Sequence, residues 1–146
     1  MIYKKDKLTI DGYNVGLLAK KFKTPVYCYS FKKLKENILA FKKSFYEINP
    51  LICFAVKSNT NIKLLNEIKK FNLGADVVSI GELMKAIKAG IKPQKIVFSG
   101  VGKTSSEIEY AISKKLLLIN AESKSEILEI EKIAKQKKTI VRIGIR

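Results

Sequence analysis

The 146-residue chain lacks several features that mark specialised classes of protein. It has no apolar run near the ~20 residues of a membrane-spanning helix, so we expect no membrane span. No apolar segment follows the charged residues at its start, so no secretory signal is evident. Its two cysteines, Cys28 and Cys53, offer neither a disulfide framework nor the spacing of metal ligands. These absences favour a cytoplasmic protein without a metal site.

Arginine is also scarce, and this bears on the strong positive charge. The formal net charge is +16, a value often associated with nucleic-acid binding. Of the 29 basic residues, however, only Arg142 and Arg146 are arginine, the residue best suited to bidentate contacts with phosphates and bases. The lysines are scattered over every predicted helix. We therefore interpret the charge as a solvated, lysine-rich surface and expect no nucleic-acid partner.

Short apolar runs rich in β-branched residues recur after residue 50. Between them lie segments of helical period, such as the one that carries Ile62, Leu65 and Ile68. The strand starts lie roughly 20–24 residues apart, which is the length of one strand, one helix and two short loops. This alternation predicts an α/β fold with a parallel sheet covered by helices. The five predicted strands are 51–56, 75–78, 95–98, 116–119 and 139–145.

Three capping-box patterns support the assignment. They are Ser79-x-x-Glu82, Thr104-x-x-Glu107 and Ser123-x-x-Glu126, and each comes just after an apolar run. The carboxyl ends of the strands and the first turns of the helices therefore meet at one edge of the sheet. Enzymes built from βα units usually place their sites at this edge.

Residues 1–30 follow a different pattern. Asp11-Gly12 is a turn signal, residues 15–22 predict a short helix, and residues 26–29 resemble a strand. Residues 31–46 predict a helix with one apolar stripe. We therefore predict an N-terminal segment at 1–30 and an incomplete βα region at 31–146.

Lys57 is the residue of greatest chemical interest. It follows six apolar residues and, by strand alternation, shares a face with the small side chains of Cys53 and Ala55. A lysine at the mouth of a sheet can be desolvated, which favours the neutral amine that attacks a carbonyl. Spacing alone leaves open a lysine that ends a strand and extends into water.

Several segments carry a resemblance to a known family. Phe54-Ala55-Val56-Lys57-Ser58-Asn59 resembles the cofactor-lysine motif of the alanine-racemase-like, fold-type III decarboxylases that use pyridoxal 5'-phosphate. Four further segments match in family order: Thr24–Tyr27, Gly74–Leu83, Phe98–Thr104 and Asn120–Ser123. Phe98–Thr104 resembles the diaminopimelate decarboxylase branch in particular. The chain departs from the pattern at Lys23 and Ile80, where glycine is common.

The resemblance implies a (β/α)₈ barrel, of which this chain would form about five βα units. Residues 1–30 would join a C-terminal β domain that lies beyond Arg146. Lys57 would hold pyridoxal 5'-phosphate as a Schiff base, while Asp76, Glu82 and Arg146 match positions near the cofactor. The chain has no histidine and no Gly-Gly pair, so the ring-stacking histidine and the glycine-rich phosphate loop of the family would also lie beyond it.

The resemblance further implies decarboxylation of meso-diaminopimelate to L-lysine, the last step of lysine biosynthesis. The full-length enzyme would be a homodimer with an amino-acid substrate, and these 146 residues alone would be inactive. One alternative is an ornithine- or arginine-type decarboxylase, which residues 98–104 disfavour. A second alternative is a non-catalytic regulator that binds pyridoxal phosphate, which residues 24–27 and 74–83 disfavour.

The dispersed lysines generate the first prediction. We expect nucleic-acid binding to be weak, independent of base sequence and abolished by physiological salt, because scattered charges act only through phosphate neutralisation. Fluorescence anisotropy with labelled duplexes of different sequence at increasing salt measures this. Sequence-specific binding that survives physiological salt would contradict the interpretation.

Overall fold

The computed structural model describes residues 1–4 and 6–146; Lys5, part of the predicted N-terminal segment, lies outside the described residues. The described chain divides into two units, residues 1–48 and residues 49–146. The first unit holds a three-stranded antiparallel sheet and two α-helices, and the second holds a five-stranded parallel sheet with four α-helices.

The first unit begins with a small meander. Its strands are β1 (Ile2–Lys4), β2 (Lys7–Ile10) and β3 (Tyr13–Asn14), joined in the order β1-β2-β3. Positive φ angles at Asp11 (49°) and Gly12 (89°) form the two-residue turn between β2 and β3. This conformation explains the Asp-Gly pair, because the favoured hairpin turn needs φ above zero at both positions.

Two capped helices complete the first unit. Helix α1 (Val15–Phe22) has the predicted bounds, and α2 (Phe31–Ser44) ends two residues earlier than predicted. The Ser30 hydroxyl accepts the N–H of Lys33 at 2.9 Å and donates to Asp11 Oδ1 at 2.6 Å. Asp11 therefore joins the hairpin turn to the first turn of α2.

The predicted strand at residues 26–29 is wrong. These residues form no regular structure and are exposed. An extended segment becomes a strand only when a neighbour satisfies its backbone groups, and no described strand pairs with it.

The second unit confirms the five predicted parallel strands. They lie in chain order, β4-β5-β6-β7-β8, and every neighbouring pair is parallel. Their bounds are β4 (Cys53–Ala55), β5 (Gly74–Val77), β6 (Ile96–Phe98), β7 (Leu118–Ala121) and β8 (Ile143–Ile145). Chain order with parallel pairing is the arrangement of consecutive βα units in a (β/α) barrel.

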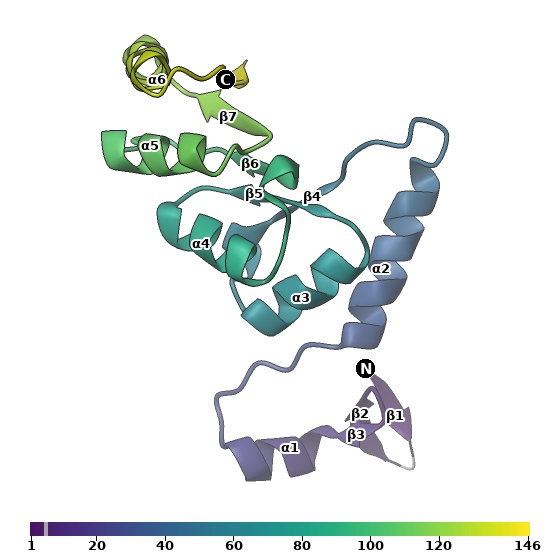
Figure 1. The fold of residues 1–146 in the computed structure, drawn as a ribbon. Helices are drawn as coiled ribbons and strands as arrows, with labels where there is room; N and C mark the ends of the chain where they lie inside the picture. The colour runs from purple at the N-terminus through teal and green to yellow at the C-terminus, as the bar shows by residue number, and fades with distance from the viewer. Residues whose placement is uncertain (5) are drawn as a thin grey trace. The chain divides into compact units, whose positions relative to one another are not determined.

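Helices alternate with these strands, as Figure 1 shows along the unit from β4 to β8. They are α3 (Ile62–Lys70), α4 (Ile80–Lys88), α5 (Ser105–Ser113) and α6 (Lys124–Gln136). Two short 3₁₀ turns interrupt the pattern, η1 (Val56–Ser58) after β4 and η2 (Pro93–Lys95) before β6.

The two faces of the five-stranded sheet differ in composition. One face is fully buried and apolar, and it carries Ala75, Val77, Ile96, Phe98 and Ile119. Helices α4 and α6 contact β5 and β7, so this is the helix-covered face. The strand register places the other set of side chains together, and these are only half-buried. We call it the open face; it carries Cys53, Asp76, Val97, Leu118, Asn120 and Gly144.

The predicted capping boxes are confirmed in part. At α5 the box is complete, since Thr104 and Glu107 each satisfy the other's backbone N–H. At α4 and α6 the serine caps the helix as expected. The glutamate, however, accepts the N–H of the residue before the serine: Glu82 from Val78 at 2.9 Å, and Glu126 from Glu122 at 2.7 Å.

A buried ion pair joins the β6–α5 loop to α6. The Lys103 side chain is 2% exposed, and its Nζ lies 3.0 Å from Glu126 Oε1, whose side chain is 8% exposed. It also donates to the carbonyl oxygens of Gly100 and Asn120, both at 2.7 Å. All three of its protons therefore have acceptors, so the charge is buried without an unsatisfied donor.

This pair generates the second prediction. Lys103→Met leaves the Glu126 carboxylate buried without a partner, so we expect a loss of about 3–5 kcal/mol in the free energy of unfolding. Urea denaturation followed by circular dichroism measures the loss. Lys132→Met removes the exposed partner of Glu129 and is the matched control, with an expected loss below about 1 kcal/mol. Equal losses in the two variants would show that the buried pair is not the stronger one.

Candidate active site

The carboxyl ends of the five parallel strands meet at one edge of the second unit. This edge brings together η1 with Lys57, the β5–α4 loop, the β6–α5 loop and the β7–α6 loop. Of the predicted site residues, Lys57 lies in η1 and Asp76 on β5. Glu82 lies in the first turn of α4, and Arg146 directly follows β8.

Lys57 lies in the 3₁₀ turn that follows β4. The strand ends at Ala55, and the turn is closed by the Ser58 hydroxyl on the Ala55 carbonyl at 2.8 Å and by the Asn59 N–H on the Val56 carbonyl at 3.0 Å. The predicted continuation of strand alternation to Lys57 is wrong, because the turn intervenes. Lys57 is exposed rather than desolvated, and its ammonium makes no hydrogen bond or ion pair within residues 1–4 and 6–146.

The open face carries a chain of polar side chains across three strands. Ser99, which directly follows β6, donates its hydroxyl proton to Asp76 Oδ1 on β5 at 2.6 Å. The Asn120 amide on β7 donates to the same hydroxyl oxygen at 2.9 Å. We call Asp76, Ser99 and Asn120 the polar array. It fixes one oxygen of the Asp76 carboxylate at the carboxyl edge.

Small residues flank the polar array. Gly144 on β8 pairs with Asn120, and a Cβ at this position would overlap Asn120 Oδ1. Gly74 on β5 pairs with Cys53, and a Cβ there would overlap the Lys95 carbonyl oxygen and the Cys53 sulfur. On the open face, each of these glycines therefore leaves the space that a group of an adjacent strand fills.

Cys53 is poorly suited to be a nucleophile. Burial, and secondarily the negative charge of Asp76, raise the pKa of its thiol. A raised pKa lowers the fraction of thiolate, which is the nucleophilic form. The half-buried Cys53 therefore has a structural rather than a nucleophilic place on the open face of β4.

The acidic side chains at the helix starts have structural partners. Glu82 holds the Val78 N–H, which accounts for its position without a ligand. A cofactor contact for Glu82 stays a prediction. Hydrogen bonds from Thr104, above all from its backbone N–H, lower the pKa of Glu107. That carboxylate therefore stays ionised as the α5 cap.

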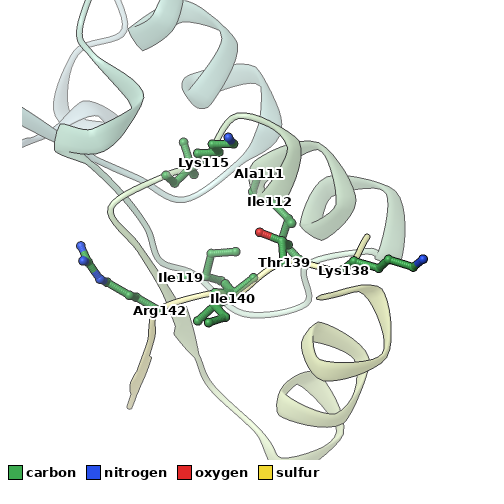
Figure 2. Close-up of a pocket in the computed structure, with 10 residues that line it drawn as sticks. Ala111, Ile112, Lys115, Ile119, Lys138, Thr139, Ile140 and Arg142 are labelled. Carbon is green, nitrogen blue, oxygen red and sulfur yellow. The ribbon is translucent and has the colours of Figure 1, made fainter. Parts of the chain in front are cut away.

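The two arginines of the last strand are not brought together. Arg146 lies at the carboxyl edge, where its Nη1 contacts Glu122 Oε1 at 3.0 Å. Arg142 precedes β8 and lines a pocket of ≈ 540 Å³ at the amino-terminal ends of β7 and β8. Figure 2 shows this pocket, with Ile119 and Ile140 beside Arg142 and with Lys115 and Lys138 also in its lining. Arg146 therefore lies at the carboxyl edge, and Arg142 does not.

The side chains of the carboxyl edge suit an aldehyde cofactor better than a metal. Lys57 offers a primary amine that has no competing partner among the described residues. Among the described residues, no group of three or more His, Cys, Asp or Glu side chains could hold a metal ion. None of the described helices has the length and apolar character to cross a membrane.

Sequence reasoning missed the roles of Ser99, Lys103 and Asn120. All three fall within segments that carry the family resemblance, but a single serine or asparagine does not by itself indicate a functional site. Their position could have indicated one, since Ser99 and Asn120 each end an apolar run at the carboxyl edge.

Comparison with known proteins identifies a matching family. Residues 31–145 match the pyridoxal binding domain of the pyridoxal-dependent decarboxylases. Over 134 residues the chain is 46% identical to the diaminopimelate decarboxylase of Helicobacter pylori (strain J99), covering 92% of this chain and 33% of that protein. It is 42% identical over 144 residues to the diaminopimelate decarboxylase of Aquifex aeolicus, covering 99% of this chain and 34% of that protein.

A solved structure extends the similarity to the fold. The crystal structure of diaminopimelate decarboxylase from Helicobacter pylori, complexed with L-lysine, superposes with a TM-score of 0.87 at 46% identity. The match covers 91% of this chain and 34% of that one. The chain therefore spans about a third of the length of the relatives that it matches.

The interlocked open face generates the third prediction. In Gly144→Ala the new methyl group overlaps the Asn120 amide, so we expect a loss of roughly 1–3 kcal/mol in the free energy of unfolding, typical of overpacking. Gly81→Ala in α4 is the control, because its Cβ meets nothing closer than 4.0 Å. We expect the control to be neutral or more stable by about 0.5–1 kcal/mol. A Gly144→Ala protein as stable as wild type would show that Asn120 is not confined as described.

Proposed function

The chain belongs to the pyridoxal-dependent decarboxylases as their pyridoxal binding domain, and from this premise we propose that Lys57 is the residue that attaches pyridoxal 5'-phosphate. The observation that carries the proposal is the state of Lys57. It is an exposed amine at the carboxyl edge, held by a short turn and without a partner among the described residues.

The surroundings of Lys57 support this role. The turn η1 is braced by the Ser58 and Asn59 hydrogen bonds, so the backbone of Lys57 is fixed while its side chain remains free to bond and to be released. When bound, pyridoxal phosphate supplies an electron-withdrawing ring that accepts the electrons left when a carboxylate departs. Lys57 Nζ, when not bonded to the cofactor, could hold a proton beside the reacting centre.

For the substrate we propose meso-diaminopimelate, with L-lysine as the product. Relatives at 42–46% identity are diaminopimelate decarboxylases, and one solved relative holds L-lysine. An arginine decarboxylase at 21% identity shares the fold and carries no argument about substrate. In this proposal Asp76, Glu82 and Arg146 face the cofactor or its substrate from the carboxyl edge.

We further propose that the full-length enzyme is a cytoplasmic homodimer. The two free cysteines of the chain are compatible with a reducing compartment. Residues 1–30 would associate with a β domain outside this chain, and residues 31–146 would form part of the cofactor-binding barrel. The start of the family match at residue 31 supports this boundary.

The fourth prediction tests the attachment of the cofactor. The full-length protein incubated with pyridoxal phosphate should absorb visible light, and borohydride reduction should fix the label on the peptide that contains Lys57. Lys57→Ala and Lys57→Arg should lose both the label and the decarboxylase activity. Alanine has no amine, and the guanidinium of arginine stays protonated and forms no Schiff base.

Peptide mass spectrometry locates the label. Lys63→Arg, an exposed lysine in α3, is the matched control and should keep both label and activity. A label on another lysine, or an unaltered label in Lys57→Ala, would refute the assignment.

A further inference from the structure

We infer that Ser99 and Asn120 are positioning residues, which hold the Asp76 carboxylate so that its free oxygen is directed to the amine of Lys57. The consequence for Lys57 rests on the proposed function. The polar array itself rests only on the described hydrogen bonds.

The hydrogen bonds of the array have one possible direction. The Asn120 Nδ2 group can only donate, so the Ser99 hydroxyl oxygen must accept from it. Ser99 has a single proton, which is then left for Asp76 Oδ1. Asp76 is therefore the acceptor at the end of the chain. The Asn120 amide thus donates to Ser99, and Ser99 in turn donates to Asp76 Oδ1.

The array uses only one of the two carboxylate oxygens. Asp76 Oδ1 accepts from Ser99, while Oδ2 receives no hydrogen bond from the described residues. Asp76 pairs with Ala55 in the sheet, and η1, which carries Lys57, contacts β5. The free oxygen is therefore available to a cation that lies where β4 passes into the turn.

The other charged groups around this edge are already engaged. Lys85 Nζ donates to Thr60 Oγ1 at 2.9 Å, and Glu82 accepts the Val78 N–H. Arg146 is paired with Glu122, whereas Arg142 lies at the opposite end of β8. On the open face, the remaining titratable group is Cys53. The pKa of its thiol is raised mainly by burial and further by the negative charge of Asp76.

Asn120 is itself held in place. Gly144 on the neighbouring strand leaves just enough space for the amide, because any Cβ there would overlap Asn120 Oδ1. The backbone carbonyl of Asn120 also accepts a hydrogen bond from the buried Lys103 ammonium, at 2.7 Å. The donor that starts the array is thus fixed by β8 and by the β6–α5 loop.

The cofactor-free protein provides the first test, with Cys53 as an internal reporter. The measurement is the rate of Cys53 alkylation by iodoacetamide, resolved by peptide mass spectrometry. Asp76→Asn should raise this rate severalfold, because it removes the negative charge that disfavours the thiolate. Ser99→Ala should change the rate when Asp76 is present and leave it unchanged in the Asp76→Asn background. Equal effects of Ser99→Ala in both backgrounds would overturn the array.

The protein loaded with pyridoxal phosphate provides the second test. A carboxylate near the cofactor-bearing nitrogen of Lys57 favours its protonated form, so it raises the pH midpoint of the visible spectral change. Asp76→Asn should lower this midpoint by about one pH unit, and Ser99→Ala by less. Ser99→Ala added to Asp76→Asn should cause no further shift. An independent further shift, or no shift in Ser99→Ala alone, would overturn the positioning role.

Matched variants separate positioning from general damage. Ser99→Thr keeps the hydroxyl and should retain the wild-type midpoint. Ser113→Ala removes a serine hydroxyl from an exposed helix end and should also leave it unchanged. Asn120→Asp removes the donor at nearly constant size and should shift the midpoint, whereas the exposed Asn66→Asp should not.

The two tests also separate this inference from the proposed function. If the wild-type protein shows no visible band with pyridoxal phosphate, the proposed function fails, together with the part of the inference that concerns Lys57. The alkylation rates of Cys53 would still decide whether Ser99 positions Asp76.

Discussion

The buried ammonium of Lys103 must find acceptors for all of its protons, and the arrangement of the central strands depends on how it does so. It draws together the Gly100 carbonyl, the Asn120 carbonyl and the Glu126 carboxylate, which come from the β6–α5 loop, β7 and α6. A charge with 2% exposure tolerates little displacement, because each lost acceptor would leave an unsatisfied donor. The same contacts hold the residue after Ser99 and the backbone of Asn120, which the register of β6 and β7 places side by side.

The two faces of the five-stranded sheet have different roles: one forms the apolar core, and the other carries the polar groups of the candidate site. The helix-covered face is apolar and fully buried, and we attribute most of the stability of the second unit to it. The open face carries groups that would be costly in a closed core, and it satisfies them by hydrogen bonds between strands. Because all five strands are parallel, these groups end at the edge where Lys57 lies. A cofactor-binding role for that edge is consistent with the family of the chain.

Helices α4 and α6 begin with the same arrangement of a capping serine and a glutamate three residues later, and this arrangement affects the candidate site. Ser79 with Glu82 at α4, and Ser123 with Glu126 at α6, cap their helices in the same way, and each glutamate also holds the residue before the serine. This fixes the direction in which β5 and β7 enter their loops. Asp76 and Asn120 stand at the same distance before their cap serines, so the repeat presents both to the open face in register.

The sequence by itself determined the order and type of the elements, the two-residue turn at Asp11-Gly12, the capped helix starts and Lys57 as the residue of interest. These are local properties, because periodicity, turn conformation and capping depend on residues only a few positions apart. Strand alternation nevertheless failed at Lys57, where a turn begins, and the run at residues 26–29 found no strand to pair with. The tertiary structure alone decided that Asp76, Ser99 and Asn120 form one array. That outcome depends on the register between strands more than twenty residues apart, which no local pattern encodes.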